Sequence, residues 1–323
     1  MKYRRLGKTG LKVSEISLGS YLTYGQVNGE ETARSCIRRA MELGINSFDT
    51  ADVYGNKFNC TGSAEAVLGK ILQEYPRDSY VLATKIGYPT TPGVNGGGLS
   101  RKHVREACEA SLRRLGTDYV DILYLHLYDE ETPVEETMEA LELLVRQGKV
   151  LYTGISNWPG EAVRQANTYA DRRGLTRLSV VQPPYNMFQR ETEKAVFPLC
   201  REQNMGAAVY FPLAQGILAG RYTSVNDLPK DSRAANQTAG QVIQAVGCLT
   251  EENLRKVQKM TKLAKEAGME MAQLALAWIL RNPEVSTVLT GASRISQLEC
   301  NVKASGIALE PALLDEIEQI LAQ

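Results

Sequence analysis

Short apolar runs alternate with longer amphipathic stretches along almost the whole chain. The runs Val-Leu-Ala at 81–83 and Ile-Leu-Tyr-Leu at 122–125 are continuously apolar, which is typical of parallel strands buried on both faces. Strands are predicted from such runs at residues 15–19, 46–51, 80–85, 121–126, 151–156, 180–185, 207–212 and 287–292. The chain therefore repeats one strand–helix unit rather than grouping its strands together.

The stretches between the strands place apolar side chains at helical spacing. Helices are predicted at residues 30–43, 63–74, 101–114, 133–146, 160–173, 191–203, 251–267, 272–281 and 294–304. Ser100 is placed to cap one of them, and Thr132-Pro-Val-Glu135 has the form of a capping box with proline at the first helical position. Near the start, two short extended pieces flank a glycine turn, so we expect a β-hairpin over residues 3–14 that closes the bottom of a barrel.

Alternating strands and helices fit two folds, an open doubly wound sheet and a closed barrel. The doubly wound dinucleotide fold requires G-x-G-x-x-G after its first strand, and residues 18–25 do not supply it. The glycine-rich stretch 93–98 lies in a long polar loop, so a mobile loop is the better interpretation. The pattern favours one (β/α)8 TIM barrel domain over residues 1–323. The long connections 87–99 and 213–250 are expected to be lids or binding loops on its catalytic face.

Composition narrows the class of protein. With 37 basic and 37 acidic residues the net charge is zero, so no nucleic-acid surface is indicated. The six cysteines include no C-x-x-C pair, so they are expected to be reduced thiols. The two histidines are too few for a histidine-rich metal site, so no bound metal is expected. The start lacks the apolar stretch of a signal peptide, and no apolar helix is long enough for membrane insertion. A cytoplasmic protein is predicted.

Four polar residues stand at or just after predicted strand ends: Asp49, Tyr54, Lys85 and His126. Strand C-termini carry the chemistry of α/β barrels, and carbonyl reduction requires a proton donor beside the substrate oxygen. A cation at Lys85 would lower the pKa of the Tyr54 phenol, while Asp49 fixes the lysine and His126 orients the substrate. Taken one by one, the same residues also read as a strand-end lysine, a turn-capping aspartate, an exposed loop aromatic and a core histidine.

A second group of residues points to a nucleotide. Ser156, Asn157 and Gln182 carry side chains that together hydrogen-bond a primary carboxamide, and the ring of Tyr210 suits stacking on a flat heteroaromatic ring. Before the last helix, the sequence Gly291-Ala-Ser-Arg294 has the composition of a phosphate site at a helix N-terminus. The alternative for that sequence is an ordinary capped helix.

At these residues the chain resembles the aldo-keto reductases over nearly its whole length. The motifs that carry the resemblance are Phe48-Asp-Thr-Ala-Asp-Val-Tyr-Gly55, Ala83-Thr-Lys85, Leu125-His126, Gly154-Ile-Ser-Asn157, Gln182-Pro-Pro-Tyr-Asn186, Pro212-Leu-Ala-Gln-Gly216 and Gly291-Ala-Ser293. The detailed likeness is to the branch that contains the potassium-channel β-subunits, through Leu99-Ser-Arg-Lys-His103, Met187-Phe-Gln-Arg190 and Leu276-Ala-Trp-Ile-Leu-Arg-Asn282.

The resemblance implies NADPH-dependent reduction of aldehydes or ketones, with Asp49, Tyr54, Lys85 and His126 as the catalytic tetrad. It implies contacts to NADP(H) from Ser20, Tyr21, Asp49, Ser156, Asn157, Gln182, Tyr210, Phe211, Leu213, Gln215, Gly216, Arg221, Arg233, Gly291, Ser293, Arg294, Gln297 and Asn301. The partner would be a small carbonyl compound. Tetramers occur in the resembled branch, so a homo-oligomer is among the assemblies that the resemblance implies.

Two positions depart from the resembled proteins. The channel subunits carry asparagine where this chain has His126, which favours an intact reductase. The family usually has glutamate at the position that Cys300 occupies in this chain. The neighbouring Glu299 is one residue away from that position, which corresponds to about 100° around a helix.

Two other functions are weighed against the reductase. The main alternative is a regulatory subunit that binds NADP(H) and a partner protein; a metal-dependent hydrolase would need clustered ligands. Beyond the tetrad, an aromatic substrate pocket is expected from Tyr21, Tyr24, Tyr54, Tyr88 and Trp158.

Overall fold

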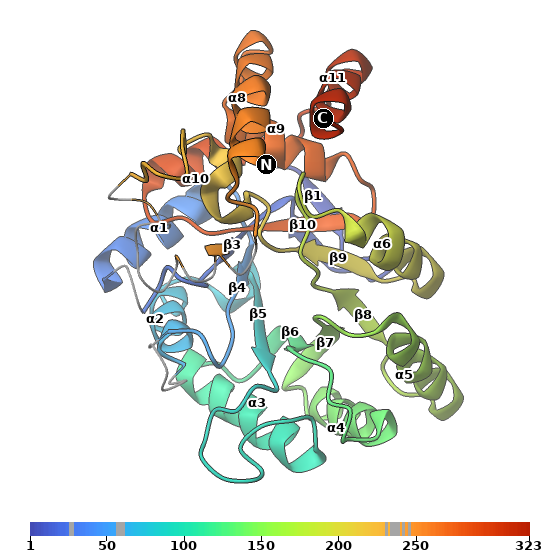
Figure 1. The fold of residues 1–323 in the computed structure, drawn as a ribbon. Coiled ribbons are helices and arrows are strands. Elements are labelled where there is room, and N and C mark those ends of the chain that lie inside the picture. The colour runs from blue at the N-terminus through green and yellow to red at the C-terminus, as the bar shows by residue number, and fades with distance from the viewer. Residues whose placement is uncertain (26–28, 56–61, 230–231, 233–239, 241–242, 245–246) are drawn as a thin grey trace.

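Eight parallel strands close into a barrel in the order β10-β3-β4-β5-β6-β7-β8-β9 (Figure 1). The computed structural model describes residues 1–25, 29–55, 62–229, 232, 240, 243–244 and 247–323. The barrel strands are β3 (Ile16–Gly19), β4 (Ser47–Asp49), β5 (Val81–Ile86), β6 (Val120–Leu125), β7 (Val150–Ile155), β8 (Leu178–Val181), β9 (Gly206–Val209) and β10 (Val285–Thr290). The predicted (β/α)8 fold is confirmed.

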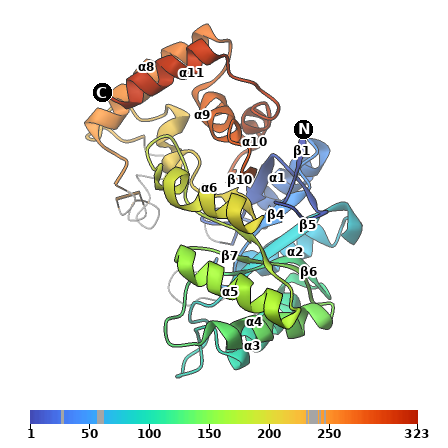
Figure 2. The ribbon, with the colours of Figure 1, turned by 90° about the vertical axis from the view of Figure 1, so that its right-hand side faces the viewer.

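Most of the helices surround the barrel and pack an apolar face into the core around it. They are α1 (Glu30–Glu42), α2 (Ser63–Leu72), α3 (Arg101–Leu115), α4 (Val134–Arg146), α5 (Gly160–Arg173), α6 (Glu191–Gln203), α8 (Glu251–Glu266), α9 (Met271–Leu280), α10 (Ile295–Val302) and α11 (Pro311–Leu321), with short 3-10 helices η1 (Arg77–Ser79) and η2 (Ala214–Ala219). Helices α8 and α11 pack against each other beyond one side of the barrel (Figure 2).

The N-terminal hairpin seals the bottom of the barrel, as the sequence predicts. Strands β1 (Tyr3–Arg5) and β2 (Lys12–Ser14) pair antiparallel, with Tyr3 opposite Ser14. Leu6 and Val13 are fully buried and pack against barrel-interior side chains, among them Val81, Ile122 and Val180. The barrel interior is therefore a filled core at this end, which leaves the opposite end for a binding site.

Three details of the sequence prediction are corrected. Strands β8, β9 and β10 end two to four residues earlier than expected, so Gln182 and Tyr210 follow their strands rather than belong to them. The expected capping box at Thr132 does not form: the helix N-cap is Pro133, and Thr132 Oγ1 donates to Asp129 instead. Helix α11 was not expected, although it begins with proline at its first turn and repeats apolar residues at helical spacing.

The capping role of Ser100 is confirmed, since its side chain accepts a hydrogen bond from the backbone N–H of His103. Within the described residues, every helix is too short or too polar to cross a bilayer.

A glycine sets the distance between helices α2 and α3. A β-carbon at Gly69 would lie 2.5 Å from the Cα of Leu115, which is the last residue of α3. This is backbone that cannot rotate away as a flexible side chain does, so the two helices would have to separate.

We expect Gly69→Ala to lower the free energy of unfolding by about 1–3 kcal/mol, the usual cost of overpacking a core. In an unobstructed helix the same change would stabilise the protein by up to about 1 kcal/mol. A fall in the free energy of unfolding therefore indicates close contact between the helices, whereas a rise indicates free space. Urea titrations followed by circular dichroism measure it. Gly10→Ala is the matched control, because nothing lies within 4 Å of its added carbon. A Gly69→Ala protein as stable as the wild type would show that the helices are not in close contact there.

Candidate active site

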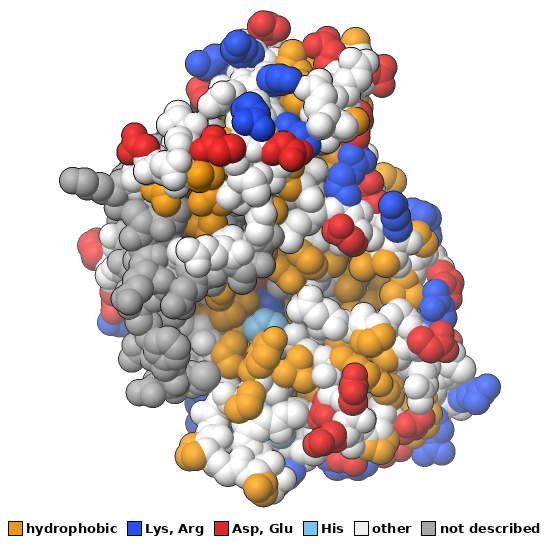
Figure 3. Space-filling view, viewed as in Figure 1, with side chains coloured by type: hydrophobic (Ala, Val, Ile, Leu, Met, Phe, Trp, Pro, Cys, Tyr) orange, Lys and Arg blue, Asp and Glu red, His pale blue; other side chains and the backbone are white. Residues whose placement is uncertain are grey.

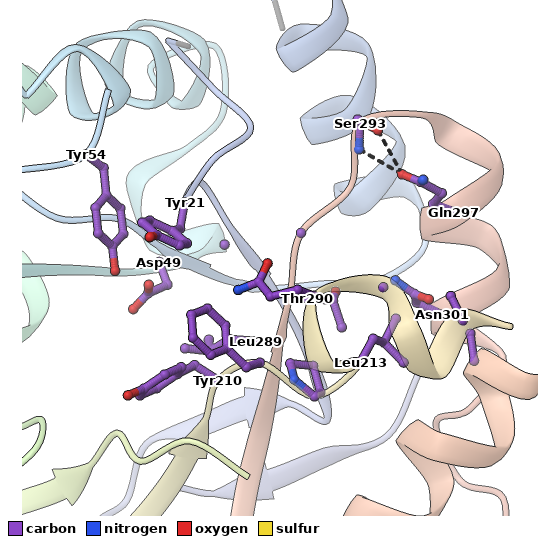
Figure 4. Close-up of a pocket in the computed structure, with 18 of the residues that line it drawn as sticks. Tyr21, Asp49, Tyr54, Tyr210, Leu213, Leu289, Thr290, Ser293, Gln297 and Asn301 are labelled. Atoms are coloured by element: carbon purple, nitrogen blue, oxygen red, sulfur yellow. Dashed lines mark hydrogen bonds between the residues drawn. The ribbon is translucent and has the colours of Figure 1, made fainter. Parts of the chain in front are cut away.

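A cavity of about 1140 Å³ opens at the C-terminal ends of the barrel strands. Its walls come from the loops after β3, β4, β5, β6, β7, β8, β9 and β10, from η2 and from one end of α9 and α10. In the space-filling view a histidine side chain is visible in a hollow framed by hydrophobic side chains (Figure 3). The cavity is elongated: Tyr21, Asp49 and Tyr54 lie toward one end, and Ser293, Gln297 and Asn301 toward the other (Figure 4).

A buried ion pair lies under the first end. Lys85 is 0% exposed, and its ammonium group contacts Asp49 Oδ1 and donates to the backbone oxygen of Thr50 at 2.8 Å. The second oxygen of Asp49 accepts a 2.9 Å hydrogen bond from Gln182 Nε2. Strands β4 and β5 are neighbours in the barrel, while Gln182 follows β8 across it. The pair therefore ties together three strands around the barrel interior.

The phenol of Tyr54 lies beside this pair, with Lys85 Nζ 4.9 Å from the centre of its ring. The expectation that the cation lowers the tyrosine pKa is wrong. Burial raises the pKa of Tyr54 well above its usual value, and the carboxylate of Asp49 raises it further. The physical reason is that Asp49 offsets the charge of Lys85 while the site removes the solvent that a phenolate needs. Tyr54 is thus held as a neutral phenol that can donate a proton.

His126 completes the group from the end of β6. Its ring centre lies 5.7 Å from that of Tyr54, with the rings nearly perpendicular. Burial, assisted by the nearby Lys85 charge, lowers the pKa of His126 to about 3. The imidazole is therefore neutral at ordinary pH, and it can donate a hydrogen bond from only one of its nitrogens. The four residues expected to be catalytic do come together in space.

One wall of the cavity is a chain of polar side chains joined by hydrogen bonds. Ser156 Oγ donates to the backbone oxygen of Gln182 at 2.8 Å, and Asn157 Nδ2 donates to Ser156 Oγ at 3.1 Å. The hydroxyl of Tyr210 donates to Asn157 Oδ1 at 3.1 Å. Asn157 has φ 57°, a left-handed conformation that asparagine tolerates better than most residues. These contacts fix the amide groups and the face of the Tyr210 ring toward the cavity.

The middle of the cavity is bordered by unusual backbone. Phe211, Ala214, Gln215 and Gly216 all have positive φ, and the last three lie within η2. Two N–H groups of this stretch are engaged within it: that of Ala214 donates to the backbone oxygen of Phe211 at 3.0 Å, and that of Gly216 donates to the backbone oxygen of Leu213 at 2.8 Å. Only one of the four is glycine, so the other three carry backbone strain that the surrounding contacts must hold in place.

The far end of the cavity is the start of α10. Arg294 is the N-cap residue, and its own side chain makes no capping hydrogen bond. The backbone N–H and the hydroxyl of Ser293 both donate to Gln297 Oε1, at 2.9 and 3.1 Å (Figure 4). The free helix end, with serine and arginine beside it, has the properties of a phosphate site.

Cys300 occupies the position where the resembled proteins usually have glutamate, and the structure shows which groups lie around it. Cys300 lines the cavity, whereas Glu299 points to α1 and pairs with Arg39 Nη2 at 2.7 Å. Gln273 Nε2 approaches Cys300 Sγ at 3.6 Å. Glu299 therefore does not replace a carboxylate at position 300. A different carboxylate, that of Glu270 at the start of α9, lines the same end of the cavity.

Most of the residues expected from the sequence line this one cavity. They are Tyr21, Asp49, Tyr54, His126, Ser156, Asn157, Gln182, Tyr210, Phe211, Leu213, Gln215, Gly216, Arg221, Gly291, Ser293, Arg294, Gln297 and Asn301. Lys85 lies behind the wall, as does Ser20, whose hydroxyl donates to Thr50 Oγ1 at 2.9 Å. Arg233 lies outside the described residues.

Some aromatic residues were misplaced by sequence reasoning. Tyr88 does line the cavity, but Tyr24 is buried in the core beside Cys36, and Trp158 donates to the backbone oxygen of Leu127 and packs on Tyr128. Glu270 and Tyr222 were missed altogether, although both line the cavity. Glu270 directly precedes helix α9, and its acidic side chain at the start of a helix was the only sequence feature that could have indicated a place in the site.

Comparison with known proteins identifies the family. The model of the aldo/keto reductase family matches residues 15–322. The chain belongs to the aldo/keto reductase family. It is 41% identical over 326 residues to a probable voltage-gated potassium channel subunit beta of Arabidopsis thaliana, covering 99% of this chain and 97% of that one. It is also 39% identical over 329 residues to the L-glyceraldehyde 3-phosphate reductase of Escherichia coli K12, covering 100% and 93%.

A further relative is the putative voltage-gated potassium channel subunit beta of Schizosaccharomyces pombe, 40% identical over 329 residues and covering 99% of this chain and 93% of that one. These relatives bear out the resemblance seen in the sequence motifs, including the branch. The family and the reductase relative together support an oxidoreductase.

A buried carboxyl group stands on the same loop as Tyr54. Asp52 is 1% exposed, and neither of its side-chain oxygens has a hydrogen-bond partner in the described part of the chain. Burial raises its pKa well above the ordinary value of 3.8, and the neighbouring Glu65 raises it further. Glu65 itself is held by Thr84 Oγ1 at 2.5 Å and by Arg114 Nε at 2.6 Å. Asp52 therefore holds its proton more tightly than an exposed aspartic acid does.

An acid with a raised folded-state pKa binds its proton more tightly when folded, so stability falls as pH rises above its unfolded pKa. We expect Asp52→Asn, which cannot ionise, to flatten this fall as the pH rises above about 3.9, the ordinary pKa of an aspartic acid side chain. The change per pH unit is at most about 1.4 kcal/mol for one proton. Denaturant titrations at several pH values measure it, with exposed Asp118→Asn as the control. An unchanged slope in Asp52→Asn would mean that Asp52 is ionised in the folded protein.

Proposed function

We propose that this protein is an NADP(H)-dependent reductase of aldehydes and ketones in which Tyr54 is the proton donor. The observation that carries the proposal is the neutral phenol of Tyr54 at the cavity wall, between the Lys85–Asp49 pair and a neutral His126. A proton donor for carbonyl reduction must keep its proton until negative charge develops on the substrate oxygen.

The cavity suits a dinucleotide because its polar groups change along its length. An amide-lined wall with the Tyr210 ring fits a nicotinamide carboxamide and its ring. The N-terminus of α10 with Ser293 and Arg294 fits a phosphate, and Arg221 after η2 brings a further positive charge to the cavity wall. NADPH, when bound along this cavity, would supply the hydride.

The protein's own groups account for the remaining chemistry. Tyr54 donates its proton to the carbonyl oxygen as charge develops there, and the imidazole of His126 hydrogen-bonds the same oxygen. The Lys85 ammonium, 4.9 Å from the centre of the Tyr54 ring, stabilises the negative charge of the resulting phenolate. Because Asp49 and Thr50 hold that ammonium in place, no reorganisation is needed when the negative charge appears.

A second candidate function is a regulatory subunit that binds NADP(H) and a partner protein. The identity to proteins named as probable potassium channel subunits, 41% over 326 residues, favours it. The two functions share the cavity but differ in turnover. A regulatory subunit would bind the nucleotide and leave a panel of aldehydes and ketones unreduced, whereas the reductase turns substrates over and depends on Tyr54.

We expect Tyr54→Phe to lower kcat by about 10² to 10⁴, the usual contribution of general acid catalysis, because it removes only the proton donor. The dissociation constant for NADPH should stay close to that of the wild type. Steady-state assays and NADPH fluorescence titrations measure the two effects. Tyr75→Phe, away from the cavity, is the control for loss of a tyrosine hydroxyl. Near-normal kcat in Tyr54→Phe would contradict the assignment of the proton donor.

We expect Arg294→Ala to weaken NADPH binding by about 1.5 to 3 kcal/mol, the scale of a hydrogen bond to a charged group. NADH should be almost unaffected, because it has no 2′-phosphate to meet the start of α10. Fluorescence titrations of both nucleotides separate the effects, with Arg105→Ala on α3 as the control for loss of an exposed arginine. Equal losses for the two nucleotides, or no loss for either, would show that Arg294 does not read that phosphate.

A further inference from the structure

The loop between β5 and α3 brings an aromatic side chain against one of the reacting groups. Residues 87–100 make this connection (Figure 1), and Tyr88 near its start lines the cavity. The ring of Tyr88 meets that of His126 edge-on at 4.9 Å, and the ring of Tyr54 lies 5.7 Å from the same imidazole. Because Tyr88 is 40% exposed, contacts of its own side chain fix it only in part. The loop must supply the rest.

The loop is closed on itself. The backbone N–H of Gly98 donates to the backbone oxygen of Gly87 at 2.8 Å, so the two ends of the loop are joined. A β-carbon at Gly97 would lie 2.9 Å from the backbone nitrogen of Pro89, the residue that follows Tyr88. A displacement of the far end of the loop is therefore transmitted to Pro89 and Tyr88.

One carboxylate holds the far end of the loop. Asp129 follows β6 three residues after His126, and its Oδ2 accepts hydrogen bonds from the backbone N–H of Leu99 and from the hydroxyl of Thr132, both at 2.7 Å. Gly98 packs directly on the same oxygen, since a β-carbon there would lie 2.8 Å from it. Hydrogen bonds to an ionised acceptor are among the stronger ones. Asp129 thus fixes the loop relative to the strand end that carries His126.

The imidazole of His126 depends on being kept from water. Its Nδ1 atom is buried and has no hydrogen-bond partner in the described part of the chain. Protonation of this nitrogen would create a buried N–H group without an acceptor, which is costly unless water can reach it. Lys85 from β5 faces the same ring and opposes a second cation, and the phenols of Tyr54 and Tyr88 complete its surroundings.

We propose that Asp129 is a positioning residue of the active site: it holds the loop 87–99 so that Tyr88 covers His126 and keeps the imidazole dry and fixed in orientation. The proposal rests on the reductase function proposed above, in which His126 hydrogen-bonds the carbonyl oxygen. Asp129 does not belong to the described lining of the cavity, so it acts through the loop.

The first test follows the protonation of His126 by NMR. The chain has only two histidines, so in protein with isotope-labelled histidine the signal missing from His126→Gln belongs to His126. Burial lowers the pKa of His126 to about 3, so the wild-type signal should stay constant between about pH 5 and about pH 8. We expect Asp129→Ala to move this pKa toward the ordinary value of about 6.5, so that the signal titrates. Glu130→Ala, at the neighbouring exposed acid, is the control and should not titrate.

The second test disturbs the same contact from the other side. Gly98→Ala places its added carbon 2.8 Å from Asp129 Oδ2, and it should make His126 titrate as Asp129→Ala does. Gly93→Ala is the matched control, because Gly93 also has positive φ, at 108°, and nothing lies within 4 Å of the added carbon. Its His126 signal should stay constant. Thermal unfolding of each variant shows whether the fold is intact.

The third test measures the consequence for catalysis. We expect Asp129→Ala and Gly98→Ala to lower kcat/KM for carbonyl reduction by about 10- to 100-fold, the order of loss that a small misplacement of a reacting group causes. The dissociation constant for NADPH should stay within about twofold of the wild type, because the groups that suit the nucleotide lie on other loops. Glu130→Ala and Gly93→Ala should keep wild-type kinetics.

The outcomes separate this proposal from the reductase function. A His126 that titrates in the wild type, or that fails to titrate in folded Asp129→Ala and Gly98→Ala proteins, would overturn the positioning role. Titration of His126 with an unchanged kcat/KM would overturn its importance for the reaction. Failure of the wild type to reduce a panel of carbonyl compounds with NADPH would overturn the reductase function, while the NMR titration would still decide whether Asp129 controls His126.

Discussion

The rest of the site depends on one buried ion pair, that of Lys85 and Asp49. An ammonium group with no solvent exposure is costly unless it is fully paired, and here a carboxylate and a backbone oxygen surround it. Gln182 in turn fixes the carboxylate from across the barrel. The pair therefore adds little by way of net stability, but it requires β4, β5 and the end of β8 to meet in one arrangement. Burial is the main cause of the raised pKa of Tyr54 and the lowered pKa of His126, and the pair adds to both shifts, through Asp49 for Tyr54 and through Lys85 for His126.

Sequence reasoning located this arrangement but misjudged its electrostatics. Asp49, Lys85 and His126 were found because a parallel barrel brings the ends of its strands together, whatever the details of packing. The pKa of Tyr54 was expected to fall because a cation was placed beside it, and it rises because the same fold removes water and adds a carboxylate. Burial depends on every neighbouring loop, so it cannot be read from the spacing of four residues.

The remaining misses have a similar cause. Tyr24 and Trp158 are aromatic residues close in sequence to site residues, yet they face the core and a backbone carbonyl. Glu270 belongs to none of the motifs, and it reaches the cavity only because α9 begins beside α10. By contrast, Arg294 and Ser293 were predictable because a helix start is marked locally in the sequence. Residues whose position is set by local geometry were predicted, and those set by packing between distant elements were not.

The way the barrel is closed also constrains the order in which the protein can fold. Arg4, in the N-terminal hairpin, donates to the backbone oxygens of Leu280, Asn282 and Val285, and the N–H of Lys2 donates to Ser305. The hairpin is thus held by residues that lie 276 to 281 positions away along the chain. Closing so long a loop is entropically costly and slows folding. Leu6 and Val13 are covered by side chains of β5, β6, β8 and β9, so a chain whose barrel has not yet formed leaves them exposed and prone to aggregation.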